Sequence, residues 1–153
     1  MSSKIDAERF GAARAAARAR RPDGAPMGPF RWAAMEDGQA VWLFARVLPA
    51  RPATLAVAAR LGPDPGESEG AAFGYWLAHA LRQDLWRALR GRRGVVPLVV
   101  VEGLGGEALW LTAGAATAEA RTLPGRAPLA AVLEAPGLRR HLRWARGRAA
   151  GQS

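Results

Sequence analysis

The first clear pattern along the chain is an alternation of apolar and other side chains. Phe30, Trp32 and Ala34 fall on one face of the run FRWAAME, because side chains of a β-strand point alternately to its two faces. Asp37 and Gly38 follow this run, and Asp-Gly is a favoured pair for a two-residue hairpin turn. The pattern therefore predicts a strand and the turn of a β-hairpin.

Two further apolar runs, 39–48 and 53–61, continue this pattern. In the first of them, Trp42 and Phe44 lie on the face opposite to Val41, so this strand is expected to be covered on both sides. Together with the preceding strand, the two runs predict a three-stranded antiparallel meander.

The run from 69 to 90 changes to a period of 3.6 residues, which predicts a long amphipathic helix. Its apolar face consists of Phe73, Leu77, Ala80, Leu81, Leu85 and Ala88. Asp84 falls in the middle of this face, where an unpaired carboxylate would cost several kcal/mol. We therefore expect Asp84 to have an arginine partner on the preceding strands, either Arg46 or Arg60.

A second stripe of the same helix carries aromatic and polar side chains. It comprises Trp76, His79, Gln83, Trp86 and Arg90, and it is the least core-like part of the helix. Trp76, His79 and Trp86 are therefore candidates for contact with a protein partner. The alternative is that the tryptophans pack into the core and the polar residues face solvent.

A second hairpin is predicted after the long helix, with strands at 95–101 and 108–113. Because proline cannot donate to a strand ladder, Pro97 predicts that the first of these strands is an edge strand or contains a bulge.

The turn of this hairpin matches the G-x-G-x-x-A form of a dinucleotide-binding fingerprint at Gly103, Gly105 and Ala108. A working fingerprint must open a helix whose N-terminus meets pyrophosphate. The run that follows, ALWLT, alternates like a strand, and Glu102 would place negative charge beside the phosphate. A glycine-rich hairpin turn is the better interpretation.

The two ends of the chain predict helices, at 6–20 near the start and at 128–135 and 137–150 near the end. Residues 114–127 fit either a strand or a loop. The expected fold class is therefore α+β: an N-terminal helix, an antiparallel sheet of about five strands (the meander plus the hairpin) packed on one long helix, and C-terminal helices.

The length of 153 residues predicts a single domain, with an N-terminal helix and linker at 1–28 and an α+β core with a basic C-terminal helix at 29–148. The element order α-β-β-β-α-β-β-α-α resembles that of the small homodimeric chaperones of secretion systems, without a shared motif. Those chaperones are typically acidic, whereas this chain is basic, so no family is assigned.

The composition excludes several chemistries. The chain has no cysteine, which excludes disulfides, iron–sulfur clusters, thiol catalysis and thiolate zinc sites. A Ser-His-Asp triad through Ser68 and His79 has no supporting motif, and no acidic metal cluster stands out. We therefore expect no cofactor and no metal. The start MSSKIDAERF has no apolar signal segment, so a cytoplasmic location without an integral membrane segment is expected.

Charge is the strongest functional signal in the sequence. The formal net charge is +9, with 21 arginines, one lysine and 13 acidic residues. A GC-rich coding bias would explain arginine in place of lysine, but not the excess of basic over acidic residues. The arginines cluster at 14–21, 82–93 and 139–148 and interleave with tryptophans, which suits phosphate contact and base stacking.

These clusters lead to the hypothesis of a non-catalytic protein that contacts the nucleic-acid backbone. The residues expected to carry this contact are Arg87, Arg90, Arg92, Arg93, Arg139, Arg143, Arg146 and Trp86. An acidic protein partner or an anionic membrane surface would suit the same charges.

Two other functions remain open at this point. One is a homodimeric interaction, adaptor or chaperone-like module, and the weaker one is an enzyme with a site near His79. For any single arginine cluster, a solvated charged face is the simplest interpretation. Convergence of all three clusters on one face of the structure would favour nucleic acid, whereas scattered clusters would favour the interaction module.

Overall fold

A computed structural model describes residues 5, 7–35, 39–48, 51–61, 70–106, 108–134 and 136–151. The elements in chain order are α1 (Ala7–Ala16), β1 (Phe30–Met35), β2 (Ala40–Ala45), β3 (Ala53–Leu61), α2 (Ala71–Ala88), β4 (Val96–Glu102), β5 (Leu109–Thr117), a 3₁₀ turn (Ala120–Thr122), α3 (Arg126–Glu134) and α4 (Leu138–Ala150). The predicted α+β fold and its order of helices and strands are confirmed. Asp37, Gly38 and Ser68, on which a turn and a triad were considered, lie outside the described residues.

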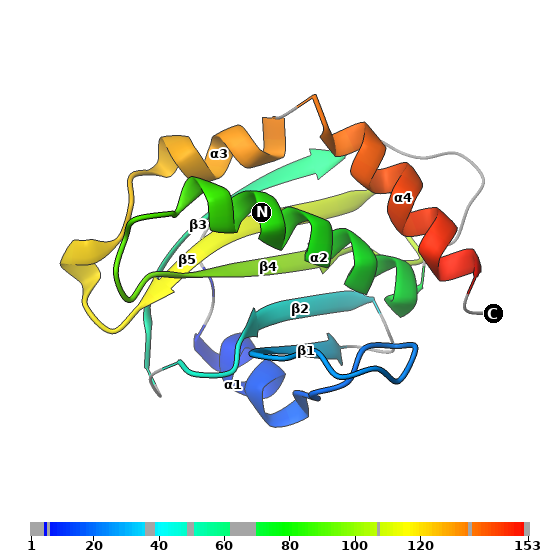
Figure 1. The fold of residues 1–153 in the computed structure, drawn as a ribbon, viewed down its shortest axis with the longest axis horizontal. Coiled ribbons are helices and arrows are strands. Elements are labelled where there is room, and N and C mark those ends of the chain that lie inside the picture. The colour runs from blue at the N-terminus through cyan, green and yellow to red at the C-terminus, as the bar shows by residue number, and fades with distance from the viewer. Residues whose placement is uncertain are drawn as a thin grey trace.

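The five strands form one antiparallel sheet in the order β1-β2-β4-β5-β3 (Figure 1). The predicted meander is therefore wrong in its pairing: β2 pairs with β4, and β3 pairs with β5 along its full length. The β4–β5 hairpin lies between them because β4 is apolar on both faces and is best buried in the centre of a sheet. By contrast, β3 carries the exposed Arg60, which suits an edge.

Pro97 lies in a central strand, so the prediction of an edge strand or a bulge is wrong. Its place is still physically sound, because the β2–β4 ladder ends at the pair Phe44–Leu98 and Pro97 pairs only with Ala115 of β5. At Val96 and Pro97, β4 has a strand neighbour on one side only, so the missing N–H of proline costs no ladder bond on the β2 side.

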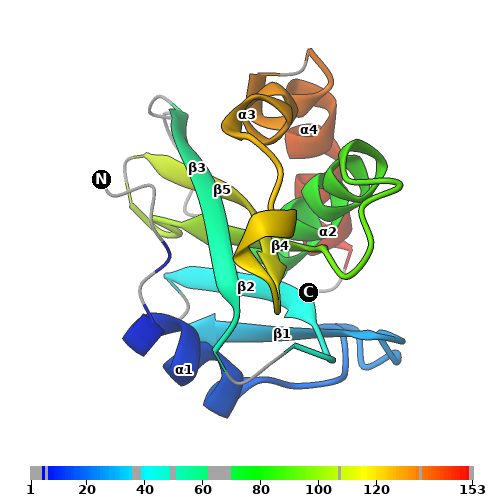
Figure 2. The same cartoon turned by 90° about the vertical axis from the view of Figure 1, so that its left-hand side faces the viewer.

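The sheet separates two apolar layers. Helices α2, α3 and α4 cover one face, and α1 covers part of the other (Figure 2). The ring of Phe10 on α1 lies 6.1 Å from that of Trp42 and 5.7 Å from that of Phe44 on β2. The prediction that the second strand is covered on both sides is therefore confirmed.

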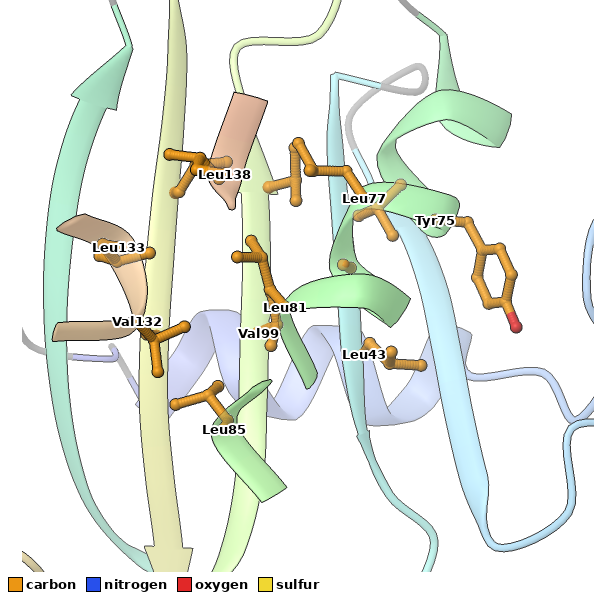
Figure 3. Close-up of a cluster of buried hydrophobic side chains, with 14 of the residues drawn as sticks. Leu43, Tyr75, Leu77, Leu81, Leu85, Val99, Val132, Leu133 and Leu138 are labelled. Carbon is orange, nitrogen blue, oxygen red and sulfur yellow. The ribbon is translucent and has the colours of Figure 1, made fainter. Parts of the chain in front are cut away.

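The main core lies between the sheet and α2, where Leu77, Leu81 and Leu85 point at the strands (Figure 3). Gly74 allows the close approach of α2 at one point, since a Cβ there would lie 2.7 Å from Cδ1 of Leu104. The predicted apolar face of this helix is thus its packing face, apart from the exposed Ala88, and Trp76 of the second stripe is also buried in this core.

The glycine motif between β4 and β5 is a hairpin turn, as expected. Gly103 has a φ of +80°, and a Cβ at this position would run into the carbonyl oxygen of Ala108. A strand follows the turn and no helix opens there, so this site lacks the helix N-terminus that a dinucleotide would need. The ambiguous segment 114–127 continues β5 to Thr117 and then becomes the 3₁₀ turn and a loop.

Helix α1 ends at Ala16, earlier than the predicted 6–20. Beyond it, the chain extends beside β1, where the N–H of Arg18 donates to the carbonyl of Trp32 at 2.9 Å and the N–H of Trp32 donates back at 3.2 Å. The indole N–H of Trp32 also donates to the carbonyl of Arg20. These bonds along a sheet edge outweigh the helix propensity of the alanines. Within the described part of the chain, no helix has the length and apolar character needed to cross a membrane.

Candidate functional site

Two groups of arginines can be distinguished by their surroundings, and the first lies on the exposed surface. We call this group the outer arginine surface; it consists of Arg87, Arg90, Arg92, Arg93, Arg139, Arg140 and Arg143. Apart from Arg87, none of these side chains has a carboxylate partner among the described residues. Arg146, which was expected to belong with them, is half-buried, and its guanidinium lies 5.7 Å from the ring centre of Phe73.

Helices α2 and α4, which carry these arginines, pack side by side in opposite directions (Figure 1). Trp76 in the early turns of α2 meets Trp144 late in α4, whereas Asp84 near the end of α2 meets His141 near the start of α4. The C-terminal half of α2 therefore lies beside the beginning of α4.

Asp84 has partners other than the predicted Arg46 or Arg60. Its Oδ2 lies 2.8 Å from Nε2 of His141, and its Oδ1 accepts from Nη1 of Arg87 at 3.2 Å. The position of Asp84 on the helix turns it toward α4 and away from the strands. The prediction that Asp84 has an arginine partner is correct, but the predicted residues were wrong. The docking of α4 on α2 cannot be derived from the sequence of α2.

Helix dipoles explain one half of the outer arginine surface and not the other. Basic residues at the C-terminal end of α2 are favourable, because the helix has a partial negative charge there. Arg139 and Arg140 lie in the first turn of α4, at its partial positive end, where no acidic residue is present. Each cation there costs about 0.3–1 kcal/mol. Stability of the helix therefore gives no reason for these two arginines.

The first predicted arginine cluster, 14–21, is divided by the structure. Arg14 lies on α1 and reaches the carbonyl of Leu48 at 3.4 Å, on the face of the sheet that α2 does not cover. Arg18 stacks on Trp32 at 4.9 Å, and Arg21 lies 5.9 Å from the ring centre of Trp76. The three clusters therefore do not converge on one face.

The second group of arginines surrounds aromatic rings. We call it the aromatic–arginine cluster; it consists of Tyr75, Trp76, His79 and Arg82 of α2, Trp144 and Arg148 of α4, and Arg21. Trp76 is its centre and is only 2% exposed. The ring of Trp76 meets those of Tyr75 at 4.9 Å and Trp144 at 5.6 Å, both edge to face, and Arg148 covers it at 4.3 Å.

His79 is held in its neutral form by this cluster. Burial, together with the positive charges of Arg82 and Arg21, lowers its pKa to about 4. Its ring stacks on Tyr75 at 6.1 Å and on Trp144 at 6.4 Å. Within the described residues its ring nitrogens make no hydrogen bond. Among the described residues, this histidine therefore has neither an orienting carboxylate nor a nucleophile hydrogen-bonded to it.

Three nitrogen donors in this cluster are buried and make no hydrogen bond within the described structure: Nε of Arg21, Nε1 of Trp76 and Nε of Arg82. Nε of Arg21 lies 3.4 Å from Oδ1 of Asp23, which is close enough for an ion pair but lacks hydrogen-bond geometry. A buried donor without a partner costs roughly 1–3 kcal/mol. All the unsatisfied buried side-chain atoms found in the described residues thus belong to one place.

The remaining polar group of the cluster is the hydroxyl of Tyr75. Its ring lies beside β1, apart from the leucines of the same helix (Figure 3), at 5.6 Å from the ring of Trp32. Burial raises the pKa of Tyr75 to about 12, although the charges of Arg21 and Arg82 oppose this shift. Burial also lowers the pKa of Arg82, whose guanidinium stacks at 4.2 Å on Phe30. The cluster therefore presents donors and positive charge, with Asp23 as the one carboxylate that acts on it.

The structure separates the three residues that were predicted to contact a partner. Trp86 is 52% exposed, His79 is half-buried and Trp76 is covered. Sequence reasoning identified the stripe of Trp76 and His79 but missed Tyr75, and it assigned Arg21 and Arg82 to the charged clusters and not to this stripe. The signal was present in part, because Tyr75 and Arg82 flank that stripe on the same side of the helix.

No group of three potential metal-ligating residues lies together in the part of the chain that the structure describes. Comparisons with protein-family models, with curated proteins and with solved structures find no match to this chain. The function must therefore be argued from the geometry alone.

Proposed function

We propose that this protein binds nucleic acid without catalysis, through contacts of the outer arginine surface with backbone phosphates and without base specificity. The observation that carries the proposal is that Arg90, Arg92, Arg93, Arg139, Arg140 and Arg143 are exposed without a carboxylate partner among the described residues. A phosphate chain would supply the counter-charges that the protein lacks. The cytoplasmic location expected from the sequence is part of the proposal.

The placement of these arginines supports the proposal beyond their number. The first turn of α4 carries two arginines at the end of the helix where cations are unfavourable, and a bound phosphate would reverse that cost. Trp86 is exposed and lies next to Arg87 and four residues before Arg90, so its ring is available for stacking on a base of a single strand.

The proposal is tested by the salt dependence of binding. The full chain is titrated into fluorescent duplex DNA and single-stranded RNA of random sequence, at salt concentrations from 50 to 200 mM. We expect the logarithm of affinity to fall linearly with the logarithm of salt, by about 0.9 per phosphate contact in duplex DNA. Failure to bind either nucleic acid at the lowest salt would refute the proposal.

Two triple variants of equal charge separate a specific surface from net charge. Arg90→Gln, Arg92→Gln and Arg93→Gln remove three outer arginines, whereas Arg46→Gln, Arg51→Gln and Arg60→Gln remove three exposed arginines elsewhere. We expect the first variant to reduce the salt slope by about 2.7 and the second to leave it nearly unchanged. Equal losses in both variants would show that only the overall charge matters.

Self-association is a second candidate function, favoured by the edge strand β3. This nine-residue strand pairs with β5 alone and presents no strand partner on its other side among the described residues. Such edges are templates for pairing with another chain. Light scattering over a hundredfold range of protein concentration tests this candidate. It requires that the protein forms a dimer and that Ala56→Pro on β3 disrupts this dimer. A monomer at all concentrations excludes it.

A further inference from the structure

We infer that the aromatic–arginine cluster is a binding site for a phosphate group, separate from the outer arginine surface. The inference starts from the three buried donors, Nε of Arg21, Nε1 of Trp76 and Nε of Arg82, which lack hydrogen-bond partners. Buried polar groups in proteins are almost always satisfied. Three exceptions in one cluster, all of them donors, indicate that an acceptor completes it.

The charge of the cluster shows what kind of acceptor is needed. Arg21 is the one guanidinium with a carboxylate nearby, that of Asp23, whereas Arg82 and Arg148 have no ion pair in the described structure. Arg82 is half-buried, and a half-buried cation without a counter-ion is costly. Arg148 is exposed and adds a second uncompensated positive charge at the border of the cluster, so a dianion would balance the two guanidinium groups.

The polar groups face a common region. The charges of Arg21 and Arg82 both act on the hydroxyl of Tyr75 and on the ring of His79, although Arg21 belongs to a different segment of the chain. The ring of Trp76 carries Arg148 at 4.3 Å and lies 5.9 Å from Arg21. Donors from three segments therefore surround this part of α2.

A phosphate group fits these requirements better than a carboxylate does. It is largely a dianion near neutral pH, and its oxygens accept hydrogen bonds from several directions, whereas a carboxylate carries one charge in a plane. Neutral His79 adds no competing charge, and its ring N–H is one more donor. Arg148 is exposed, so a change in its side-chain torsions gives access to the ring of Trp76 while α2 and α4 stay in place.

The site does not depend on the proposed function, because it uses none of the arginines of the outer arginine surface. The same phosphate chemistry has two sources, a free phosphate or small phosphate ester and the terminal phosphate of a nucleic acid. The experiment therefore has one arm for each source.

In the first arm, inorganic phosphate is titrated into the full chain at constant ionic strength, with chloride as the reference ion. Binding is followed by calorimetry and by tryptophan fluorescence, since Trp76 and Trp144 lie in the cluster. We expect saturable binding of one phosphate, with a fluorescence change that chloride does not produce. No difference between phosphate and chloride would overturn the inference.

Variants assign the binding to the cluster. Arg82→Gln is expected to weaken phosphate binding by about 10- to 100-fold, because it removes a charge-assisted contact. Arg148→Gln at the exposed border and Tyr75→Phe, which keeps the ring, are expected to weaken it by about 3- to 10-fold. Arg60→Gln on the edge strand is the control of equal charge. Equal effects of Arg60→Gln and Arg148→Gln would overturn the inference even if Arg82→Gln fails to fold.

In the second arm, single-stranded oligonucleotides with a 5′-phosphate or a 5′-hydroxyl are compared. If the phosphorylated strand binds more tightly and Arg148→Gln abolishes this difference, the source is a nucleic-acid end. If both strands bind equally while inorganic phosphate still binds, the source is a free phosphate. Binding of the hydroxyl strand reports on the outer arginine surface alone. Absence of binding of the hydroxyl strand would refute the proposed function and would leave the inference of a phosphate site unaffected.

Discussion

The aromatic–arginine cluster and the outer arginine surface use the same residue type in opposite ways. In the cluster, Arg82 and Arg148 lie over rings at 4.2 and 4.3 Å, Arg82 half-buried and Arg148 at the exposed border. On the surface, Arg143, only five residues before Arg148 on the same helix, is exposed and has no carboxylate or ring partner among the described residues. The difference teaches that an arginine-rich helix can contribute to a core and to an exposed charged surface at once, depending on which side faces α2.

The largest difference between the two regions is expected in their contributions to stability. Trp76→Ala should lower the free energy of unfolding by about 3–5 kcal/mol, because it leaves a cavity where a ring packs against four neighbours. Trp86→Ala, on the exposed side, should cost under about 0.5 kcal/mol. Urea unfolding of both variants measures the contrast, and equal costs would remove the distinction between cluster and surface.

The contact that joins the two regions should have the next largest effect. Asp84 holds His141 of α4 and Arg87 of α2, so Asp84→Ala should cost about 1–3 kcal/mol of unfolding free energy and loosen α4. Gln83→Ala, at an exposed neighbouring position, is the matched control and should change little. Hydrogen exchange of the α4 amides should rise in the Asp84 variant alone. Unchanged protection of α4 would show that the tryptophans hold the helix without this contact.

Acid should weaken the cluster before it affects the surface. The pKa of His79 is about 4 in the folded protein against an unperturbed value of 6.5 in the unfolded chain, so the unfolded chain binds more protons between these values. The stability due to neutral His79 is therefore complete above pH 6.5 and is lost as pH falls toward 4. Allowing for partial exposure, wild type should lose about 1–2 kcal/mol more than His79→Gln over this range.

The smallest expected effect has opposite signs in the two properties measured. Arg139→Glu places an acid in the first turn of α4, which should raise the free energy of unfolding by about 0.3–1 kcal/mol. The same change should weaken nucleic-acid binding, because it reverses a charge on the outer arginine surface. Arg126→Glu in the first turn of α3 is the control for the dipole effect, and it should stabilise without a loss of binding.

The local pattern was sufficient to predict the elements but not their neighbours in the sheet. The third strand was predicted at 53–61, which matches β3, because its alternation is a property of the segment itself. Its pairing with β5 depends on a hairpin formed some 50 residues later, which no local pattern records. The prediction of an edge strand from Pro97 was wrong for the same reason. The point at which β2 ends determines whether the central strand β4 tolerates a proline there.

The candidate site was predictable only in part because its residues come from three segments. The spacing of Trp76 and His79 revealed an unusual stripe, and the charge revealed the arginines. The roles of individual arginines depend on tertiary contacts: Arg21 was grouped with the arginines of the first predicted helix, but it lies at a turn near Trp76. Asp84 was correctly expected to need a partner, and the docking of α4 decided that the partner is His141.

The strand order has a consequence for folding of the chain during its synthesis on the ribosome. β2 and β3 are made early, yet each pairs with a strand of the later hairpin, β2 with β4 and β3 with β5. At about 5–20 residues per second, roughly 3–11 s separate the synthesis of β3 from that of its partner. During this interval β2 and β3 lack the hairpin strands with which they finally pair. The sheet therefore closes late, and these apolar strands need protection from solvent until it does.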